Sequence, residues 1–319
     1  MNRKYNKFTL DLDETFIWNE IEFLKFLSTN QGQDIVINTN SEGCCLEVSG
    51  VYEILDQFKF NSVRITTSNL LENHSQYIIK IINPYKFLTG GNYNKYHSWT
   101  KQKIFGAMYG RPKWHRIGIT AHLYTKYSQE SLLNFRSNPN IEDQRMLFNL
   151  QTLFNFSPES AKLFLSVYDQ LPLLIEQQDS YTIGATTQQH TDQLAGYYLD
   201  FLIDIVSETF TKGKTFFITE KTVRPMLLKK PFIIMGSRNF LAYLKQMGFK
   251  TFDKYWNEGY DFYEGKDRYL NILKLIDSLA TKSISDLDKI YEDMQEILDH
   301  NYNLLHNQSF IKKIEYIND

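Results

Sequence analysis

The sequence predicts an α/β protein built from two parallel-sheet units, and three observations lead to this prediction. Short apolar runs alternate with amphipathic helical patterns through residues 1–100, as is typical of βαβ units. A second alternation follows and contains a fully apolar run at residues 231–235, as expected of a strand buried on both faces. The 319 residues, 42% of them hydrophobic, are enough for one large or two medium cores. We therefore expect one unit over residues 1–100 and another over residues 101–319.

In the first unit the pattern predicts four strands and two helices. The strands are expected at residues 8–12, 34–38, 63–67 and 77–82, and the helices at residues 18–27 and 51–58. Such alternation favours a parallel sheet with right-handed crossovers, and ligands approach a sheet of this kind at the carboxyl ends of its strands. The acidic and histidine residues just beyond those ends are Asp11, Asp13, Glu42, Glu72 and His74.

Residues 84–99 lack helical or strand periodicity and are predicted to form a linker between the units. Basic residues alternate with aromatic ones in this segment and just after it, at Lys95, His97, Lys101 and Lys103, a composition also found on surfaces that bind single-stranded nucleic acid. A formal net charge of -2 gives no global attraction to nucleic acid or to a membrane. A polar linker packed by its tyrosines and a nucleic-acid surface are both consistent with the sequence.

The second unit is predicted to mix strands with helices and to carry a helical insertion at residues 137–191. Strands are expected at residues 104–109, 197–207 and 231–235. Helices are expected at residues 116–127, 268–279 and 284–305, around residues 240–244, and inside the insertion at residues 141–155 and 158–170.

The segment at residues 216–227 carries the chemistry that suits a nucleotide best. An apolar run is followed by Thr219, the expected helix N-cap, and then by Glu220 and Lys221 at the start of a helical pattern. A carboxylate there can accept hydrogen bonds from ribose hydroxyls, while a cation and the helix dipole attract phosphates. On spacing alone, a capping role for Glu220 with Lys221 and Arg224 solvated explains the pattern equally well.

The run Ile218-Thr219-Glu220-Lys221, followed by Arg224 and a proline-containing apolar strand that ends at Gly236, resembles the donor-binding motif of the α-1,3-fucosyltransferase family. This resemblance implies that Glu220 holds the ribose of a nucleotide sugar and that Lys221 holds its diphosphate, with Arg224 as a further donor contact.

Two upstream features extend the resemblance to roughly residues 102–261. Arg116 follows a strand and its loop and begins a helix, and it matches the position of a family Arg that contacts the donor diphosphate and precedes a helix that in the family ends Leu-x-x-Tyr. Arg111, Lys113 and His115 near the same helix start can also bind phosphate, although surface basicity alone would explain them too. Glu208 matches a family Glu at the end of the strand that precedes the Thr-Glu-Lys motif, so it is expected either to bind sugar hydroxyls or to cap the loop. The chain departs from the family at Thr209, where the family has Asn, and in its Tyr-Gly-Arg loop, where the family has Ser-Asn.

The resemblance implies a glycosyltransferase of the GT-B architecture, in which two Rossmann-like domains face a cleft and the second domain binds the nucleotide sugar. It also implies inversion at the anomeric carbon. We expect no obligatory metal or other cofactor, because no Asp-x-Asp motif stands where a metal-dependent sugar transferase needs it, and Asp11-Leu12-Asp13 lies in the first unit. The acceptor remains open between a glycan and a hydroxylated nucleic-acid base. A carboxylate of the first domain is expected to take the acceptor proton. Glu42 is the best placed by sequence, followed by Asp13, Glu72 and His74.

Two other functions remain open. The run FTLDLDET resembles the motif of haloacid-dehalogenase-type phosphatases, which implies Asp11 as nucleophile and Asp13 as general acid. The later Gly-Asp-x-x-x-Asp magnesium motif of those enzymes does not occur at a predicted strand end. The third possibility is a nucleotide-binding module without catalysis.

The remaining composition bears on the compartment. The two cysteines, Cys44 and Cys45, are adjacent, a spacing that suits neither a zinc site nor a disulfide framework, so we expect a reducing cytoplasm. No apolar window approaches the length of a membrane span, and the N-terminus lacks an apolar signal core. Frequent Asn, Lys, Ile, Tyr and Phe indicate an AT-rich coding source, compatible with a virus or a low-GC bacterium.

Overall fold

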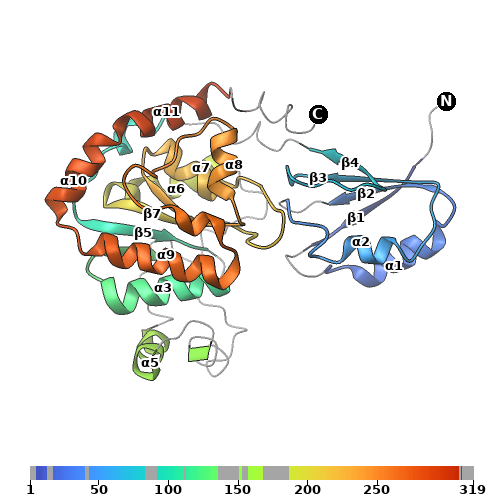
Figure 1. Cartoon of the computed structure of the whole chain (residues 1–319), viewed down its shortest axis with the longest axis horizontal. Helices are drawn as coiled ribbons and strands as arrows, with labels where there is room; N and C mark the ends of the chain where they lie inside the picture. The colour runs from blue at the N-terminus through green and yellow to red at the C-terminus, as the bar shows by residue number, and fades with distance from the viewer. Residues whose placement is uncertain are drawn as a thin grey trace.

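The computed structural model confirms a mixed α/β fold with two separate parallel sheets (Figure 1). It describes residues 5–12, 17–39, 43–82, 92–110, 113–135, 151–152, 157–167, 187–308 and 310. Within these residues, the strand orders are β1-β2-β3-β4 and β6-β5-β7-β8, and every pairing is parallel. None of the described helices is both long enough and apolar enough to span a bilayer.

The first sheet keeps its strands in chain order. Its strands are β1 (Asn6–Leu10), β2 (Asp34–Thr39), β3 (Ser62–Thr67) and β4 (Ile78–Ile81). Helices α1 (Glu20–Thr29) and α2 (Val51–Leu55) lie on the same face of this sheet (Figure 1). Ligands of open α/β sheets bind where the strand order reverses, and the four described strands contain no such reversal.

In the second sheet the strand order does reverse. The chain runs from β5 (Lys103–Met108) outward to β6 (Ser131–Asn134), then returns to the other side of β5 as β7 (Phe201–Ser207), followed by β8 (Phe232–Met235). The carboxyl ends of β5 and β7 therefore form a topological switch point, the usual position of a ligand crevice.

Helices cover both faces of the second sheet. Figure 1 shows α3 (Trp114–Tyr127) and α9 (Gly265–Ala280) on one face, with α6 (Thr187–Leu194) and α7 (Glu220–Leu227) on the other. The remaining described elements are η2 (Asn94–Tyr96), α5 (Pro158–Val167), η4 (Ala195–Leu199), α8 (Phe240–Gln246), η5 (Gly259–Phe262), α10 (Ile284–Asp293) and α11 (Gln295–His306).

Three details differ from the sequence-based expectations. The strand predicted from residue 197 begins at Phe201, because residues 195–199 form a 3₁₀ turn. The single helix predicted at residues 284–305 is two helices, since Met294 has φ -91° and ψ 1° and ends α10. Strand β6 was not predicted at all. The expected helix at residues 141–155 lies outside the described residues except for residues 151–152, which are helical, and α5 accounts for residues 158–167 of the next one.

The described part of the predicted linker packs on the second unit. Tyr93 and Trp99 are buried in the second core, and the indole of Trp99 donates to the carbonyl of Lys103 at 2.9 Å. Lys101 pairs with Asp288, and the ammonium of Lys103 donates to the carbonyl of Gln129 at 2.6 Å. These contacts favour the packed linker over a nucleic-acid surface.

The two units meet through a buried junction at Asn69, just beyond β3. The Asn69 side-chain NH₂ donates to the carbonyl of Lys214 at 2.8 Å, and its oxygen accepts from the backbone N–H of Phe216 at 2.9 Å. Leu70 belongs to the core of the second unit, whereas Phe210 of the second unit is buried in the core of the first. Each core thus contains a side chain from the other unit.

Candidate functional site

The start of α7 has the geometry that the sequence predicts. Thr219 is extended, with φ -98° and ψ 178°, and its hydroxyl accepts from the backbone N–H of Lys221 at 3.1 Å. Thr219 is therefore the N-cap, and Glu220 and Lys221 occupy the first turn beside the switch point. The positive end of the helix dipole points toward this region.

Glu208 anchors α7 to the end of β7. One of its carboxylate oxygens accepts from the Thr219 hydroxyl at 2.7 Å, and the other accepts from the hydroxyl of Thr222 and, at 3.3 Å, from the backbone N–H of Thr219. Burial raises the pKa of Glu208, against the opposing effects of Lys221 and the two threonine hydroxyls. Both oxygens are engaged by α7, so these contacts favour the capping role over a sugar contact.

Glu220 and Lys221 form an ion pair that solvent still reaches. Their side chains lie 2.7 Å apart and are about a fifth exposed, at 21% and 20%. Burial alone raises the pKa of Glu220, but the charges of Lys221 and Arg224 outweigh it and lower that pKa to about 2. Glu220 is therefore ionised at neutral pH and can only accept hydrogen bonds, as binding to ribose hydroxyls requires.

Two further cations from the α3 side converge on residues 207–209. Arg116 is buried and donates to the carbonyls of Ser207 at 3.0 Å and Glu208 at 3.3 Å. The ammonium of Lys113 donates to the carbonyl of Thr209 at 2.6 Å, and that of Lys221 to the Thr209 hydroxyl at 3.4 Å. The structure thus brings together three positive charges around the end of β7.

His115 contacts the same segment, residues 207–209, through Ser207. Its Nδ1 lies 2.7 Å from the hydroxyl of Ser207. Burial, followed by the charges of Arg116 and Lys113, holds the pKa of His115 well below its usual range. The imidazole is neutral at physiological pH and positions Ser207 without adding charge.

Arg224 faces the protein interior. It is 2% exposed and hydrogen-bonds the side chain of Tyr198, whose hydroxyl in turn donates to Asp204. Burial raises the pKa of Asp204 to about 7, against the hydrogen bond from Tyr198 and the charge of Arg224. These contacts assign Arg224 to the core beneath β7, so the predicted donor contact from this residue has no structural support.

Of the three first-unit carboxylates predicted as catalytic, Glu72 lies within the described residues. Glu42 and Asp13 lie outside the described residues. Glu72 is buried and accepts from the Tyr52 hydroxyl at 2.7 Å, the Leu46 backbone N–H at 3.1 Å and the Asn69 side-chain NH₂ at 3.0 Å. Burial raises the pKa of Glu72, although these hydrogen bonds oppose it. Both oxygens of Glu72 are occupied, which favours a structural role over that of a base.

The other candidate residues described near the strand ends of the first unit are His74 and Asp11. His74 stacks on Tyr52 and Tyr77, with centroid distances of 4.3 Å and 4.6 Å. The side chain of Asp11 is exposed, while its backbone N–H donates to the Asn19 side chain at 3.0 Å. Within the described ranges, no three His, Cys, Asp or Glu side chains are grouped so that they could hold a metal ion.

Comparison of the chain with protein-family models found no match, and searches of curated proteins and of solved structures found none either. The similarity to the fucosyltransferase motif therefore remains a prediction from residues 102–261.

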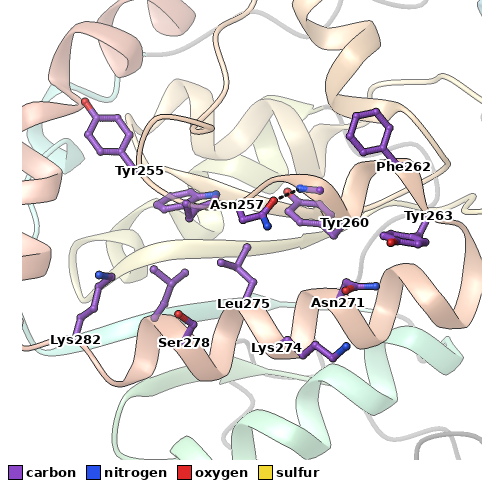
Figure 2. Close-up of a pocket in the computed structure, with 13 residues that line it drawn as sticks. Tyr255, Asn257, Tyr260, Phe262, Tyr263, Asn271, Lys274, Leu275, Ser278 and Lys282 are labelled. Atoms are coloured by element: carbon purple, nitrogen blue, oxygen red, sulfur yellow. Dashed lines mark hydrogen bonds between the residues drawn. The ribbon is translucent and has the colours of Figure 1, made fainter.

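Sequence reasoning missed a pocket on another face of the second unit. A cavity of about 540 Å³ lies between α9 and residues 255–263 (Figure 2). None of the residues around the start of α7 lines it. The available signal was the aromatic-rich run YWNEGYDFY at residues 255–263, next to a helix whose polar residues repeat at helical spacing.

Proposed function

We propose that this protein is a glycosyltransferase that binds a nucleoside-diphosphate sugar at the N-terminus of α7. The observation that carries the proposal is the convergence of Lys113, Arg116 and Lys221 on residues 207–209, beside the ionised Glu220 and at the switch point of the second sheet. Helix N-termini and clustered cations are the usual protein ligands of a diphosphate.

The ion pair of Lys221 and Glu220 supplies two complementary groups for such a ligand. On binding, the ammonium of Lys221 contacts the diphosphate and the carboxylate of Glu220 accepts from the ribose hydroxyls. Arg116 acts differently, because its hydrogen bonds to the carbonyls of Ser207 and Glu208 hold the loop in place. Its charge still contributes to the positive potential that attracts the donor.

In the transfer step, the acceptor oxygen forms a bond to the anomeric carbon as the bond to the diphosphate breaks. The proton of the acceptor hydroxyl passes to a base, for which Glu42 remains our first choice among the first-unit carboxylates. The developing negative charge on the leaving diphosphate is stabilised by Lys221 and the α7 N-terminus. The glycan and the hydroxylated nucleic-acid base remain the two proposed acceptor classes, and no obligatory metal is proposed.

Calorimetric titration with GDP, UDP and their sugars tests the donor site. Lys221→Ala should weaken the binding of the preferred nucleotide by about 1.5–3 kcal/mol, the range of a hydrogen bond to a charged group. Lys250→Ala is the matched control, because Lys250 also pairs with a glutamate at 2.7 Å, on α11, and should bind the nucleotide like the wild type.

Unchanged nucleotide affinity in Lys221→Ala would refute the proposed site. Magnesium-dependent release of phosphate from an aryl phosphate, lost in Asp11→Asn but kept in Lys221→Ala, would instead support the phosphatase alternative. Nucleotide binding without sugar transfer to any acceptor would support the third possibility, a nucleotide-binding module without catalysis.

A further inference from the structure

The pocket between α9 and residues 255–263 has one aromatic wall and one polar helical wall (Figure 2). Its volume of about 540 Å³ falls in the range of small-molecule sites. The aromatic wall consists of Tyr255, Trp256, Tyr260, Phe262 and Tyr263.

The helical wall is one face of α9 and the residue that continues it. Its lining residues include Asn271, Lys274, Leu275 and Ser278 of α9, together with Lys282, which lies two residues beyond the helix end and continues the four-residue spacing. Figure 2 shows these side chains along the helix and past its C-terminal end, across from the aromatic segment. The wall therefore presents an amide, a hydroxyl and two ammonium groups around an apolar centre.

The aromatic wall combines a fixed floor with an exposed rim. Trp256 and Tyr260 are buried, whereas Phe262 is 68% exposed and Tyr263 is 47% exposed. The side-chain oxygen of Asn257 accepts from the backbone N–H of Gly259 at 2.7 Å. The NH₂ group of Asn257 takes no part in this hydrogen bond. Exposed aromatic rings beside a preformed pocket offer a stacking surface, and binding to them costs little conformational entropy.

The charge of the pocket has one sign. No Asp or Glu belongs to its lining, while Lys274 and Lys282 both do. Among the described residues, neither lysine forms an ion pair, in contrast to Lys245 and Lys250 nearby. The pocket therefore favours a ligand that carries negative charge.

We propose that this pocket binds an oligosaccharide that carries anionic groups, as the part of the acceptor that does not react. Sugar rings pack on Phe262 and Tyr263, their hydroxyls hydrogen-bond Asn271 and Ser278, and carboxylate, sulfate or phosphate groups contact the two lysines. The choice of a saccharide rests on the proposed function. It is also favoured over nucleic acid because the pocket has only two cations and several amide and hydroxyl groups.

The position of the pocket fits an acceptor that extends from between the two units. Tyr263 precedes Glu264, whose carboxylate accepts from the backbone N–H of Gly213 at 2.7 Å. Gly213 in turn packs against Val48 and Cys45 of the first unit. The Tyr263 end of the pocket therefore lies next to the junction, and a chain that leaves the junction can continue along α9.

Direct binding measurements test this site separately from catalysis. The probes are a galacturonate hexamer, a heparin hexasaccharide, maltohexaose and a single-stranded oligothymidylate. The wild type should bind at least one anionic hexamer more tightly than maltohexaose, and this preference should shrink as salt is added. Phe262→Ala should weaken binding of the anionic hexamer about 3- to 10-fold. Lys274→Ala with Lys282→Ala should remove the preference over maltohexaose.

The controls separate this proposal from the donor site. Lys289→Ala, on the exposed side of α10, should bind every probe like the wild type. Lys221→Ala should bind the hexamers normally even where its nucleotide binding is lost, so the two proposals can fail independently. Tighter binding of oligothymidylate than of either anionic hexamer would overturn the saccharide assignment. Failure of the wild type to bind any hexamer, or equal affinities in the wild type and Phe262→Ala, would overturn the site itself.

Discussion

Glu72 shows how residue-scale contacts decide the role of a carboxylate at a strand end. Its oxygens satisfy the Tyr52 hydroxyl, the Leu46 N–H and the Asn69 NH₂, all of them buried. Glu72→Ala leaves these donors without an acceptor and should lower the free energy of unfolding by about 2–4 kcal/mol. Urea denaturation measures this change. Glu42→Gln should instead keep the wild-type stability.

The same pair of positions tests the proposed base in an assay of sugar transfer. Glu42→Gln should lower turnover by about 10²- to 10⁴-fold with donor affinity unchanged, the range of general-base catalysis. Glu72→Gln keeps the shape of the side chain and should keep most of the turnover. The reverse outcome, a folded Glu72→Gln without turnover beside an active Glu42→Gln, would identify Glu72 as the base.

At the scale of elements, the short connection from α7 to β8 contains a buried lysine. Lys230 is fully buried, and its ammonium donates to the carbonyl of Ser98 at 2.8 Å. Burial lowers its pKa to about 7, against the opposing charge of Asp200. The pKa of an unfolded lysine is about 10.4, so between these values the unfolded chain binds more protons than the folded one. The contribution of Lys230 to the free energy of unfolding therefore rises with pH between about 7 and about 10.4.

Lys230→Met keeps the aliphatic stem and removes the titrating group. We expect the free energy of unfolding to rise less steeply between about pH 8 and about pH 10 than in the wild type. Asp204 contributes in the opposite sense. Because its pKa is raised to about 7, its contribution to the free energy of unfolding falls as the pH rises to about 7 and then stays constant. This effect is complete below the window of the measurement. Urea denaturation across the window measures the slope. Lys289→Met, at an exposed position, should keep the wild-type slope, and an equally steep Lys230→Met would contradict the assignment.

At the scale of the whole molecule, local signals predicted every described strand except β6, but they did not predict the burial of charged side chains. The run at residues 231–235 is apolar throughout and predicted β8, and Thr219 predicted the start of α7. Strand β6, Ser131–Asn134, contains only two apolar residues and closely follows a helix, so periodicity does not separate it from that helix. The inward direction of Arg224 depends on Tyr198, and the engagement of Glu72 depends on Tyr52, neither of which is a neighbour in sequence. Contacts between residues that are distant in sequence leave no local pattern from which they could be predicted.

Asn69 is the residue on which the coupling of the two units should depend. Besides its bonds to Lys214 and Phe216, its NH₂ donates to the carbonyl of Cys44 at 3.3 Å, and the side chain is fully buried. Asn69→Ala leaves several buried polar groups unsatisfied on both sides of the junction and should cost at least about 3 kcal/mol. Among the described residues, few apolar side chains cross this junction: Leu70 and Phe210 are buried in the opposite core, and Leu71 and Ile81 pack against the second core, so loss of the polar contacts should also separate the unfolding of the two units.

The readout is urea denaturation in a Trp18→Phe background, where the tryptophan fluorescence of Trp99, Trp114 and Trp256 reports the second unit alone. Far-ultraviolet circular dichroism reports both units. The two signals should coincide in the background protein and in the exposed control Asn303→Ala, as expected of one cooperative transition. In Asn69→Ala they should diverge, with the smaller first unit unfolding at lower urea because it has the smaller core. Coincident curves in Asn69→Ala would mean that the apolar contacts across the junction suffice to couple the units, and the polar junction would then serve local stability alone.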